Sequence, residues 1–262
     1  MSADFSKFKN YYFMRCFSNE EYRDAFNNGE KIYINSTKYF HDLEDNFQQD
    51  FEGGVFRQLP NTRGILILSK SKITLNEAVE KVVENRFSNG ELFFRTSDFK
   101  VYINGYIFCL TIIPKSYIEF RENEIVFNEN HNIRDGFYHL LNQYTNDKGY
   151  TYVCVYDAEH FMRIFYESMS NRGYNICYGC IDYQSISLEE KIQYYVQHDI
   201  EKLVFTKDEQ YSYQNEFRLF FQKTNHENPD HIEETGIAMQ PSVVKDMVYL
   251  SPDYVEKLQI GN

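Results

Sequence analysis

Short apolar runs separated by polar turns extend along most of the chain and predict more strands than helices. The first run, residues 11–17, reads as a strand that carries one charged side chain. A short amphipathic helix is predicted over 19–27, with Ser18 as its N-cap and Glu21 completing a capping box. Residues 31–36 then return as a second strand. The first forty residues therefore predict a strand–helix–strand unit.

The same reading predicts a single α+β domain over residues 1–262, with mixed, mainly antiparallel sheets and flanking helices. Asn104-Gly105 favours a hairpin turn, and the polar residues 224–234 favour a long exposed loop. The further strands are predicted at 64–68, 91–95, 101–113, 124–127, 150–156, 175–183, 214–221 and 247–250, and the further helices at 75–87, 133–144, 157–172, 188–195 and 253–259.

The stretch 211–221 combines an apolar face with a polar face when it is read with the two-residue period of a strand. Its polar face carries an amide, a carboxylate and a guanidinium, at Gln214, Glu216 and Arg218. Two interpretations follow. The carboxylate and the guanidinium satisfy each other at a sheet surface, or Glu216 faces a cleft and takes part in chemistry.

Composition and charge limit the function classes. The chain has 39 acidic and 27 basic residues, for a formal net charge of −12. Such an acidic protein is a poor candidate for broad, salt-sensitive binding to duplex DNA, although a local basic patch can still bind a strand. Tyr and Phe are abundant, 23 of each, and Trp is absent. Aromatic abundance alone does not define a base-stacking surface.

The cysteines and the start of the chain indicate a compartment. Five cysteines, an odd number, favour reduced thiols in a cytoplasmic protein. Cys177 and Cys180 have the C-x-x-C spacing, but no second pair completes a zinc site, so we predict no metal centre. Residues 1–10 lack the apolar segment of a signal peptide, and no apolar run reaches membrane-spanning length. We therefore expect no membrane partner.

Residues 39–54 form a polar, acidic segment with aromatic anchors. Asp50 and Glu52 lie within it, together with three further carboxylates. Two interpretations remain open: a solvated surface loop, or a loop organised by a ligand, a metal or opposing Arg side chains.

Three short motifs together resemble the mono-ADP-ribosyltransferases. They are Arg15 on the first strand, Asn35-Ser36-Thr37 at the end of the second, and Gln214-x-Glu216 late in the chain. This arginine–serine–glutamate layout is similar to that of the bacterial toxins and phage-defence proteins of that family, including members that modify nucleobases or arginine. The resemblance covers little of the chain.

The resemblance implies an ADP-ribosyltransferase-like fold and an enzyme that uses NAD as a substrate. Glu216 would stabilise the positive charge that develops on the ribose, and Gln214 would orient the acceptor. Arg15 would bind a phosphate of the dinucleotide, and Ser36 or Thr37 the nicotinamide ribose. The acceptor would be nucleic acid or protein, and an antitoxin or a phage protein would be a further partner.

Two other functions remain open from the residues themselves. Asp50, Glu52 and Glu216, with Lys207 or Lys223 nearby in sequence, would suit a metal-dependent nuclease that holds Mg²⁺. Alternatively, the chain is a non-enzymatic, acidic interaction protein in the conflict between phage and host.

Overall fold

The structure is a computed structural model of the whole chain. It describes residues 4–37, 39, 105–120, 152–185, 194, 197, 199–223 and 231–241, and the strand backbone alone at 63–67, 87–88, 91–95, 121, 124–127 and 248–249.

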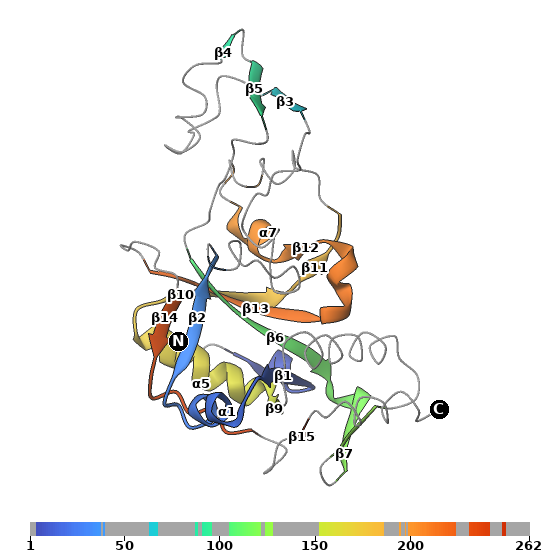
Figure 1. Cartoon of the computed structure of the whole chain (residues 1–262), viewed down its shortest axis with the longest axis vertical. Helices are drawn as coiled ribbons and strands as arrows, with labels where there is room; N and C mark the ends of the chain where they lie inside the picture. Colours follow the sequence, from blue (N-terminus) through green and yellow to red (C-terminus); the bar gives the residue numbers. More distant parts are fainter. Residues whose placement is uncertain are drawn as a thin grey trace.

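A curled antiparallel sheet of eight strands forms the centre of the α+β fold (Figure 1). Its strand order is β10-β13-β6-β1-β9-β15, and β2 pairs with both β6 and β14. The strands are β1 (Tyr11–Phe17), β2 (Ile32–Ser36), β6 (Tyr106–Pro114), β9 (Tyr152–Asp157), β10 (Asn175–Cys180), β13 (Glu216–Gln222), β14 (His231–Glu234) and β15 (Val248–Tyr249). The apolar runs of the sequence thus become strands that are buried in the middle of the sheet.

The sheet forks along one edge of β6. The end of β6 pairs with β1, where Met14 lies opposite Thr111. The beginning of β6 pairs with β2, where Asn35 lies opposite Ile107. Within the described part of the chain, the stretch of β6 between these pairings has no strand on that edge. Cys109 lies in this unpaired stretch, so its backbone carbonyl is open to a hydrogen bond from a side chain.

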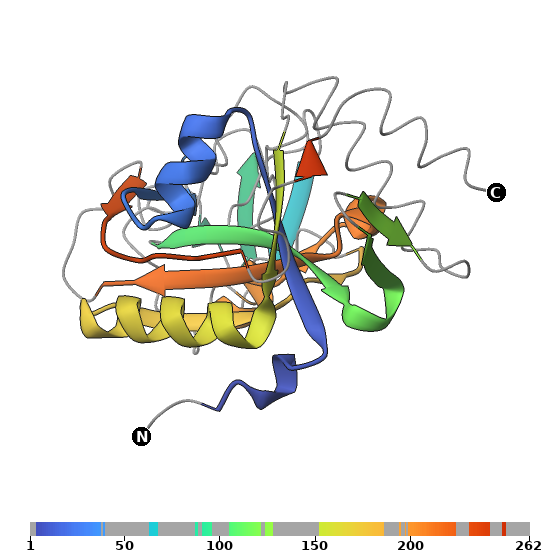
Figure 2. The same ribbon diagram turned by 90° about the horizontal axis from the view of Figure 1, so that it is seen from below.

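One face of the sheet is covered by α5 (Ala158–Asn171), which lies alongside β13 in Figure 2. Asp157 caps this helix by accepting a hydrogen bond from the amide of His160 at 3.0 Å. Gly173 follows its end with φ 83°, a left-handed conformation that favours glycine. The aromatic core lies between α5 and the sheet, and includes Phe13, Phe108, Phe161, Phe165, Phe217 and Phe221.

The opposite face of β13 is covered by smaller elements. A short parallel pair joins β11 (Asp182–Tyr183) to β12 (Thr206–Lys207). The helix α7 (Ile200–Val204) leads into β12, and the 3₁₀ helix η4 (Glu209–Gln214) leads into β13. These elements carry the polar residues of the candidate site.

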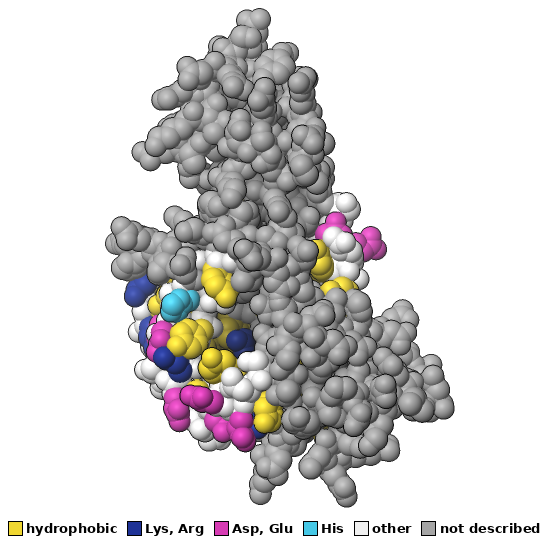
Figure 3. All heavy atoms as spheres, viewed as in Figure 1, with side chains coloured by type: hydrophobic (Ala, Val, Ile, Leu, Met, Phe, Trp, Pro, Cys, Tyr) yellow, Lys and Arg dark blue, Asp and Glu magenta, His cyan; other side chains and the backbone are white. Residues whose placement is uncertain are grey.

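The remaining described elements are small. They are η1 (Ser6–Phe8), α1 (Glu20–Asn27), β3 (Arg63–Ile67), β4 (Phe87–Ser88), β5 (Glu91–Arg95), η3 (Lys115–Tyr117), β7 (Ile118–Arg121) and β8 (Glu124–Phe127). Acidic side chains gather over α1 on the face shown in Figure 3, and Glu20 and Glu21 occupy the first turn of that helix. Acidic side chains at a helix N-terminus are favourable because the N-terminal end of the helix dipole is positive.

The predicted α+β class is confirmed, and so are most of the strands that fall on described residues. Four details were wrong. The N-cap of α1 is Asn19, whose side chain accepts from the Tyr22 amide, and not Ser18. The predicted strand 175–183 breaks at Ile181 into β10 and β11. Residues 231–234, predicted as exposed loop, form β14 because β2 offers them an edge to pair with.

The fourth error concerns Gln214, which ends η4 and does not lie on a strand. Asn215 follows it with φ 42°, in the left-handed region, and β13 begins only at Glu216. Asn adopts this conformation more readily than other non-Gly residues, so the turn is encoded locally.

Several predictions lie outside the described residues: the acidic segment 40–54, the helices 133–144 and 253–259, nearly all of the helices 75–87 and 188–195, and the first arm of the hairpin at 101–104. The last residue of the predicted helix 75–87 lies in β4 instead. No helix in the described part of the chain has the length and apolarity needed to cross a membrane.

Candidate functional site

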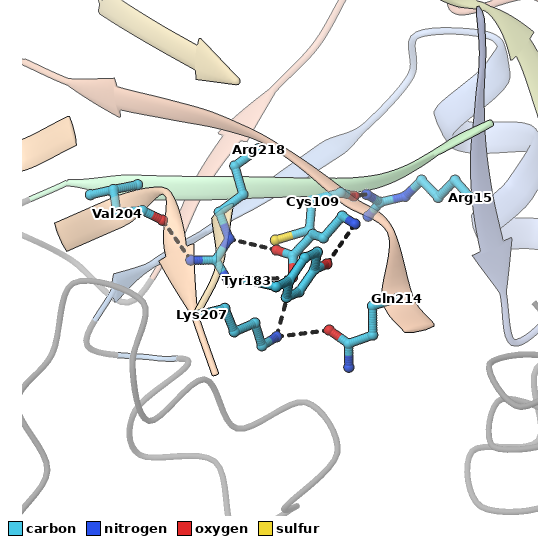
Figure 4. A network of polar contacts seen from close by, with 8 residues as sticks. Arg15, Cys109, Tyr183, Val204, Lys207, Gln214 and Arg218 are labelled. Carbon is cyan, nitrogen blue, oxygen red and sulfur yellow. Dashed lines mark hydrogen bonds and ion pairs between the residues drawn. The ribbon is translucent and has the colours of Figure 1, made fainter. Parts of the chain in front are cut away.

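Glu216, Arg218 and Lys207 meet on the face of β13 that is turned away from α5 (Figure 4). All three are buried, and Arg218 has no exposed surface at all. Charged side chains are rarely buried unless they are paired. The cluster is therefore the feature of the described chain that most needs a chemical explanation.

Arg218 binds the carboxylate of Glu216 side-on. Its Nε donates to Oε1 at 2.5 Å and its Nη2 to Oε2 at 3.3 Å, while its Nη1 donates to the Val204 carbonyl at 2.7 Å. Lys207 Nζ donates to Glu216 Oε2 at 3.2 Å and to Gln214 Oε1 at 2.8 Å. Gln214 and Glu216 are thus joined through one ammonium group, whose bond to Gln214 is drawn in Figure 4.

The carboxylate is held ionised. Burial by itself raises the pKa of Glu216, but the charges of Arg218 and Lys207 outweigh it and hold the pKa well below its usual range. The neighbouring Cys109 thiol also contributes to the lowering of this pKa. A carboxylate has about four lone-pair sites. Two bonds from Arg218 and one from Lys207 occupy three of them.

Two residues without any sequence signal complete the cluster. The Glu216 amide donates to the hydroxyl oxygen of Tyr183 at 2.8 Å. Tyr183 is the register partner of Lys207 in the β11–β12 pair, so both side chains reach the same place. Cys109 is the register partner of Arg218 on β6. Burial raises the pKa values of the Tyr183 hydroxyl and the Cys109 thiol, so both groups stay neutral.

Arg15 lies on the other face of the sheet. Its guanidinium carbon is 4.3 Å from the centroid of the Phe108 ring and 5.1 Å from that of Phe26, both members of the aromatic core. At the fork of the sheet, Nη1 donates to the Cys109 carbonyl at 3.4 Å. The side chain of Cys109, the register partner of Arg218, lies on the opposite face with Glu216. The sheet itself therefore separates Arg15 from the carboxylate.

Ser36 and Thr37 are also apart from Glu216. Ser36 is the register partner of Tyr106 at the beginning of β6, whereas Glu216 is the partner of Thr111. Five residues of strand separate these positions, roughly 16 Å along β6. Both side chains are fully buried, and Ser36 Oγ accepts from the Tyr39 amide at 3.0 Å. Of the five predicted site residues, the structure brings together only Gln214 and Glu216.

Of the residues of the nuclease hypothesis, only Glu216 and Lys207 meet among the described residues. Asp50 and Glu52 lie outside the described ranges, and Lys223 Nζ lies over the ring of Tyr174 at 5.1 Å, beyond the end of β13. No group of three or more potential metal ligands occurs in the described part of the chain. The two cations on Glu216 would also compete with Mg²⁺ for its oxygens.

A cavity of about 590 Å³ lies along β10. Lys7, Asp182, Asp199, Glu201 and Lys202 contribute its charged lining, and Cys177 and Cys180 also border it. Its lining includes neither Glu216 nor Gln214. Cys177 and Cys180 are both free thiols on β10.

Comparison of the chain with protein-family models, curated proteins and solved structures finds no match. The assignment of function therefore rests on the geometry and chemistry of the cluster. The sequence pattern located Glu216, Gln214 and Arg218, and it named Lys207 only as a neighbour of Glu216 in the nuclease hypothesis. Tyr183 and Cys109 come from distant segments, and no local pattern marks them.

Proposed function

We propose that the chain is an NAD-dependent ADP-ribosyltransferase of the toxin or phage-defence type, with an ADP-ribosyltransferase-like fold and Glu216 as its catalytic carboxylate. One observation carries this proposal: a buried carboxylate, held ionised and rigid by Arg218 and Lys207, lies beside the amide of Gln214. This is the Gln-x-Glu pair on which the resemblance to the family rests.

The chemistry requires such a carboxylate. When the bond between nicotinamide and ribose breaks, positive charge develops on the ribose, as in glycoside hydrolysis. A fixed anion in a desolvated site stabilises this charge without having to reorganise. Glu216 would accept a hydrogen bond from the ribose 2′-hydroxyl. Arg218 and Lys207 occupy three of its about four lone-pair sites, so one is left for this hydroxyl.

The predicted NAD-binding residues do not contribute to this argument. Arg15 lies behind the sheet, and Ser36 and Thr37 lie at the far end of β6. The proposal therefore depends on the Glu216 cluster alone, in which Arg218 and Lys207 are the cations near the carboxylate.

A non-enzymatic binding protein is the second candidate, and one observation favours it. Glu216 already accepts three hydrogen bonds from Arg218 and Lys207, as in a cluster whose role is to hold β13 against β12. Buried ion pairs of this kind also serve to specify a fold. The same experiment separates the two candidates.

The test is to incubate the purified protein with NAD labelled in its adenylate moiety and with cell extract, and to follow label in protein, RNA and DNA. We expect labelling by the wild-type chain. Glu216→Asp keeps the negative charge but shortens the side chain by one methylene, which moves the carboxylate away from the ribose. We expect this variant to lower labelling at least a hundredfold. Circular dichroism would establish that the variant is folded. Equal labelling by the wild type and a folded Glu216→Asp variant would refute the catalytic role, and no labelling at all would leave the binding protein as the function.

A further inference from the structure

β10 lies at one end of the eight-stranded sheet, and its outer edge has no strand partner in the described part of the chain. The Ile181 amide donates to the Glu216 carbonyl at 2.9 Å, which continues the β10–β13 register by one residue. Hydrogen-bonded and non-hydrogen-bonded positions alternate along an antiparallel ladder. The odd-numbered residues of β10 therefore bond to β13. The amides and carbonyls of the even-numbered residues point to the outer edge, at Ile176, Tyr178 and Cys180.

The outer edge is paired just beyond β10. The Asp182 amide donates to the Phe205 carbonyl at 2.8 Å, and β11 begins its pairing with β12 at the same place. Strand pairing on this side thus stops between Asp182 and Cys180. A strand edge that presents a row of unpaired amides and carbonyls is a template for a further strand. Within the described chain, the outer edge of β10 is such a row over residues 176–180.

The cavity of about 590 Å³ lies at this edge, because residues 176–180 all contribute to its lining. Lys7 borders the cavity on the face that α5 covers. Its ammonium lies 4.8 Å from the centroid of the Tyr178 ring, which in turn contacts Tyr166 of α5. Phe205 and residues of α7 border the cavity from the opposite face. Binding pockets commonly enclose about 300–1,000 Å³. The unpaired edge is thus lined from both faces of the sheet by a cavity of that size.

Thr206 brings a buried hydroxyl to this cavity. In the β11–β12 pair, Tyr183 and Lys207 point to the Glu216 cluster. Asp182 and Thr206 are the neighbouring register pair, so they point the opposite way, to the cavity that both line. Thr206 is 4% exposed, and its Oγ1 has no hydrogen-bond partner among the described residues. Buried hydroxyls are nearly always paired, and this one can donate to a ligand or accept from it.

The charged lining of the cavity is acidic on balance. Three carboxylates stand against two ammonium groups: Asp182, Asp199 and Glu201 against Lys7 and Lys202. Lys202 Nζ lies 4.0 Å from Asp182 Oδ2, whereas Glu201 has no ion-pair partner in the part of the chain that the structure describes. The whole chain carries a formal net charge of −12. Both the local and the total charge therefore favour a basic ligand.

We propose that the outer edge of β10 binds an extended, basic segment of a partner protein as an additional strand of the sheet. The main chain of the segment pairs with Ile176, Tyr178 and Cys180. Its Lys or Arg side chains lie against the carboxylates of the cavity, and one of its polar groups bonds to the Thr206 hydroxyl. Main-chain groups that repeat every second residue are matched by another extended chain and not by a small metabolite. This binding function is independent of the proposed transferase.

Three labelled heptapeptides with blocked ends test the proposal. The basic peptide alternates Val and Lys, and the acidic peptide has Glu in place of each Lys. The third peptide is the basic one with every backbone amide N-methylated, which keeps the charges but removes the main-chain donors. At fixed low salt we expect the wild-type chain to bind the basic peptide at least about tenfold more tightly than either of the others. Fluorescence anisotropy measures the three affinities.

Cys180→Pro tests the strand edge directly. Cys180 is exposed and its amide points outward, so proline removes one donor from the edge without removing a bond to β13. We expect this variant to bind the basic peptide at least about tenfold more weakly, because it loses a hydrogen bond and the proline ring obstructs the incoming strand. Cys180→Ala keeps the amide and should bind as the wild type does. Circular dichroism would establish that both variants are folded.

Two further variants test the cavity. Thr206→Val keeps the shape of the side chain and removes the hydroxyl. We expect about two- to tenfold weaker peptide binding. The unfolding temperature should not fall, since the hydroxyl has no partner to lose among the described residues. Glu201→Gln should weaken binding of the basic peptide about two- to fivefold. Glu209→Gln removes an exposed carboxylate that does not line the cavity, and should leave the affinity unchanged.

Amide hydrogen exchange, followed by NMR, gives a second readout that needs no variant. In the free protein we expect the amides of residues 176, 178 and 180 to exchange faster than those of 177 and 179, which bond to β13. Saturation with the basic peptide should slow exchange at the three even-numbered positions. It should leave the two odd-numbered positions nearly unchanged.

Several results would overturn the proposal. They are equal binding of the N-methylated and the unmodified basic peptide, full binding by a folded Cys180→Pro variant, and slow exchange at the even-numbered positions before peptide is added. A dimer in sedimentation experiments that Cys180→Pro dissociates would assign the edge to a second copy of the chain and refute the basic partner.

Discussion

Replacing Glu216 by Gln should destabilise the protein strongly, whatever its function. The substitution keeps the shape of the side chain but removes its charge. One carboxylate oxygen becomes an amide nitrogen, which then faces donors from Arg218 or Lys207. Arg218, with no exposed surface, would keep only the Val204 carbonyl and part of its former partner. The variant thus creates a buried cation without its anion.

Removal of one partner from a buried ion pair costs about 3–5 kcal/mol, because the other charge stays desolvated. Domains are stable by only about 5–15 kcal/mol, so this loss is a large fraction of the total. Chemical denaturation at pH 7 measures it. The pair Arg218→Met and Glu216→Gln/Arg218→Met completes a double-mutant cycle, in which we expect a coupling free energy above about 1 kcal/mol.

The same reasoning fixes the dependence on pH. The pKa of Glu216 is lower in the folded state than its ordinary value of 4.5. A group with a depressed folded pKa contributes stability that is complete above the unfolded pKa and is lost as the pH falls towards the folded pKa. The stability difference between wild type and Glu216→Gln should therefore be constant from pH 8 to 6 and shrink below about pH 4.5. A Glu216→Gln variant within 1 kcal/mol of wild type at pH 7, or a difference that does not shrink in acid, would refute the buried ion pair.

Two further predictions concern the framework around the cluster. A Cβ on Gly105 would lie 2.2 Å from the Phe220 ring, so Gly105→Ala should lower the free energy of unfolding by about 1–3 kcal/mol in chemical denaturation. A Cβ on Gly173 meets no atom within 4 Å, so Gly173→Ala should lose only the roughly 1–2 kcal/mol that an Ala costs at a φ of 83°. Near-UV circular dichroism should show no change in core packing for Gly173→Ala. Arg15→Met should lose about 1–2 kcal/mol through its contacts with Phe108 and the Cys109 carbonyl, and equal stability of this variant and the wild type would contradict the cation–π contact.

The candidate site was only partly predictable from the sequence. The pattern placed Glu216 and Arg218 on one face of a strand, and the structure confirms that they bind each other. It placed Gln214 on the same strand, which was wrong, because the period-two reading does not detect a left-handed Asn215. The two side chains meet nonetheless, since Lys207 bridges them.

The sequence by itself determined the α+β class, most of the described strands, the helix α5 and the polar face of β13, because hydrophobic period and turn chemistry are local properties. Only the tertiary structure decided which polar groups meet. Antiparallel register places Arg15 on the aromatic face and Cys109 on the other, and the β11–β12 pair brings Tyr183 and Lys207 to Glu216. Side chains on neighbouring positions of a strand point to opposite faces, so strand pairing, and not distance along the chain, selects the partners of a buried charge.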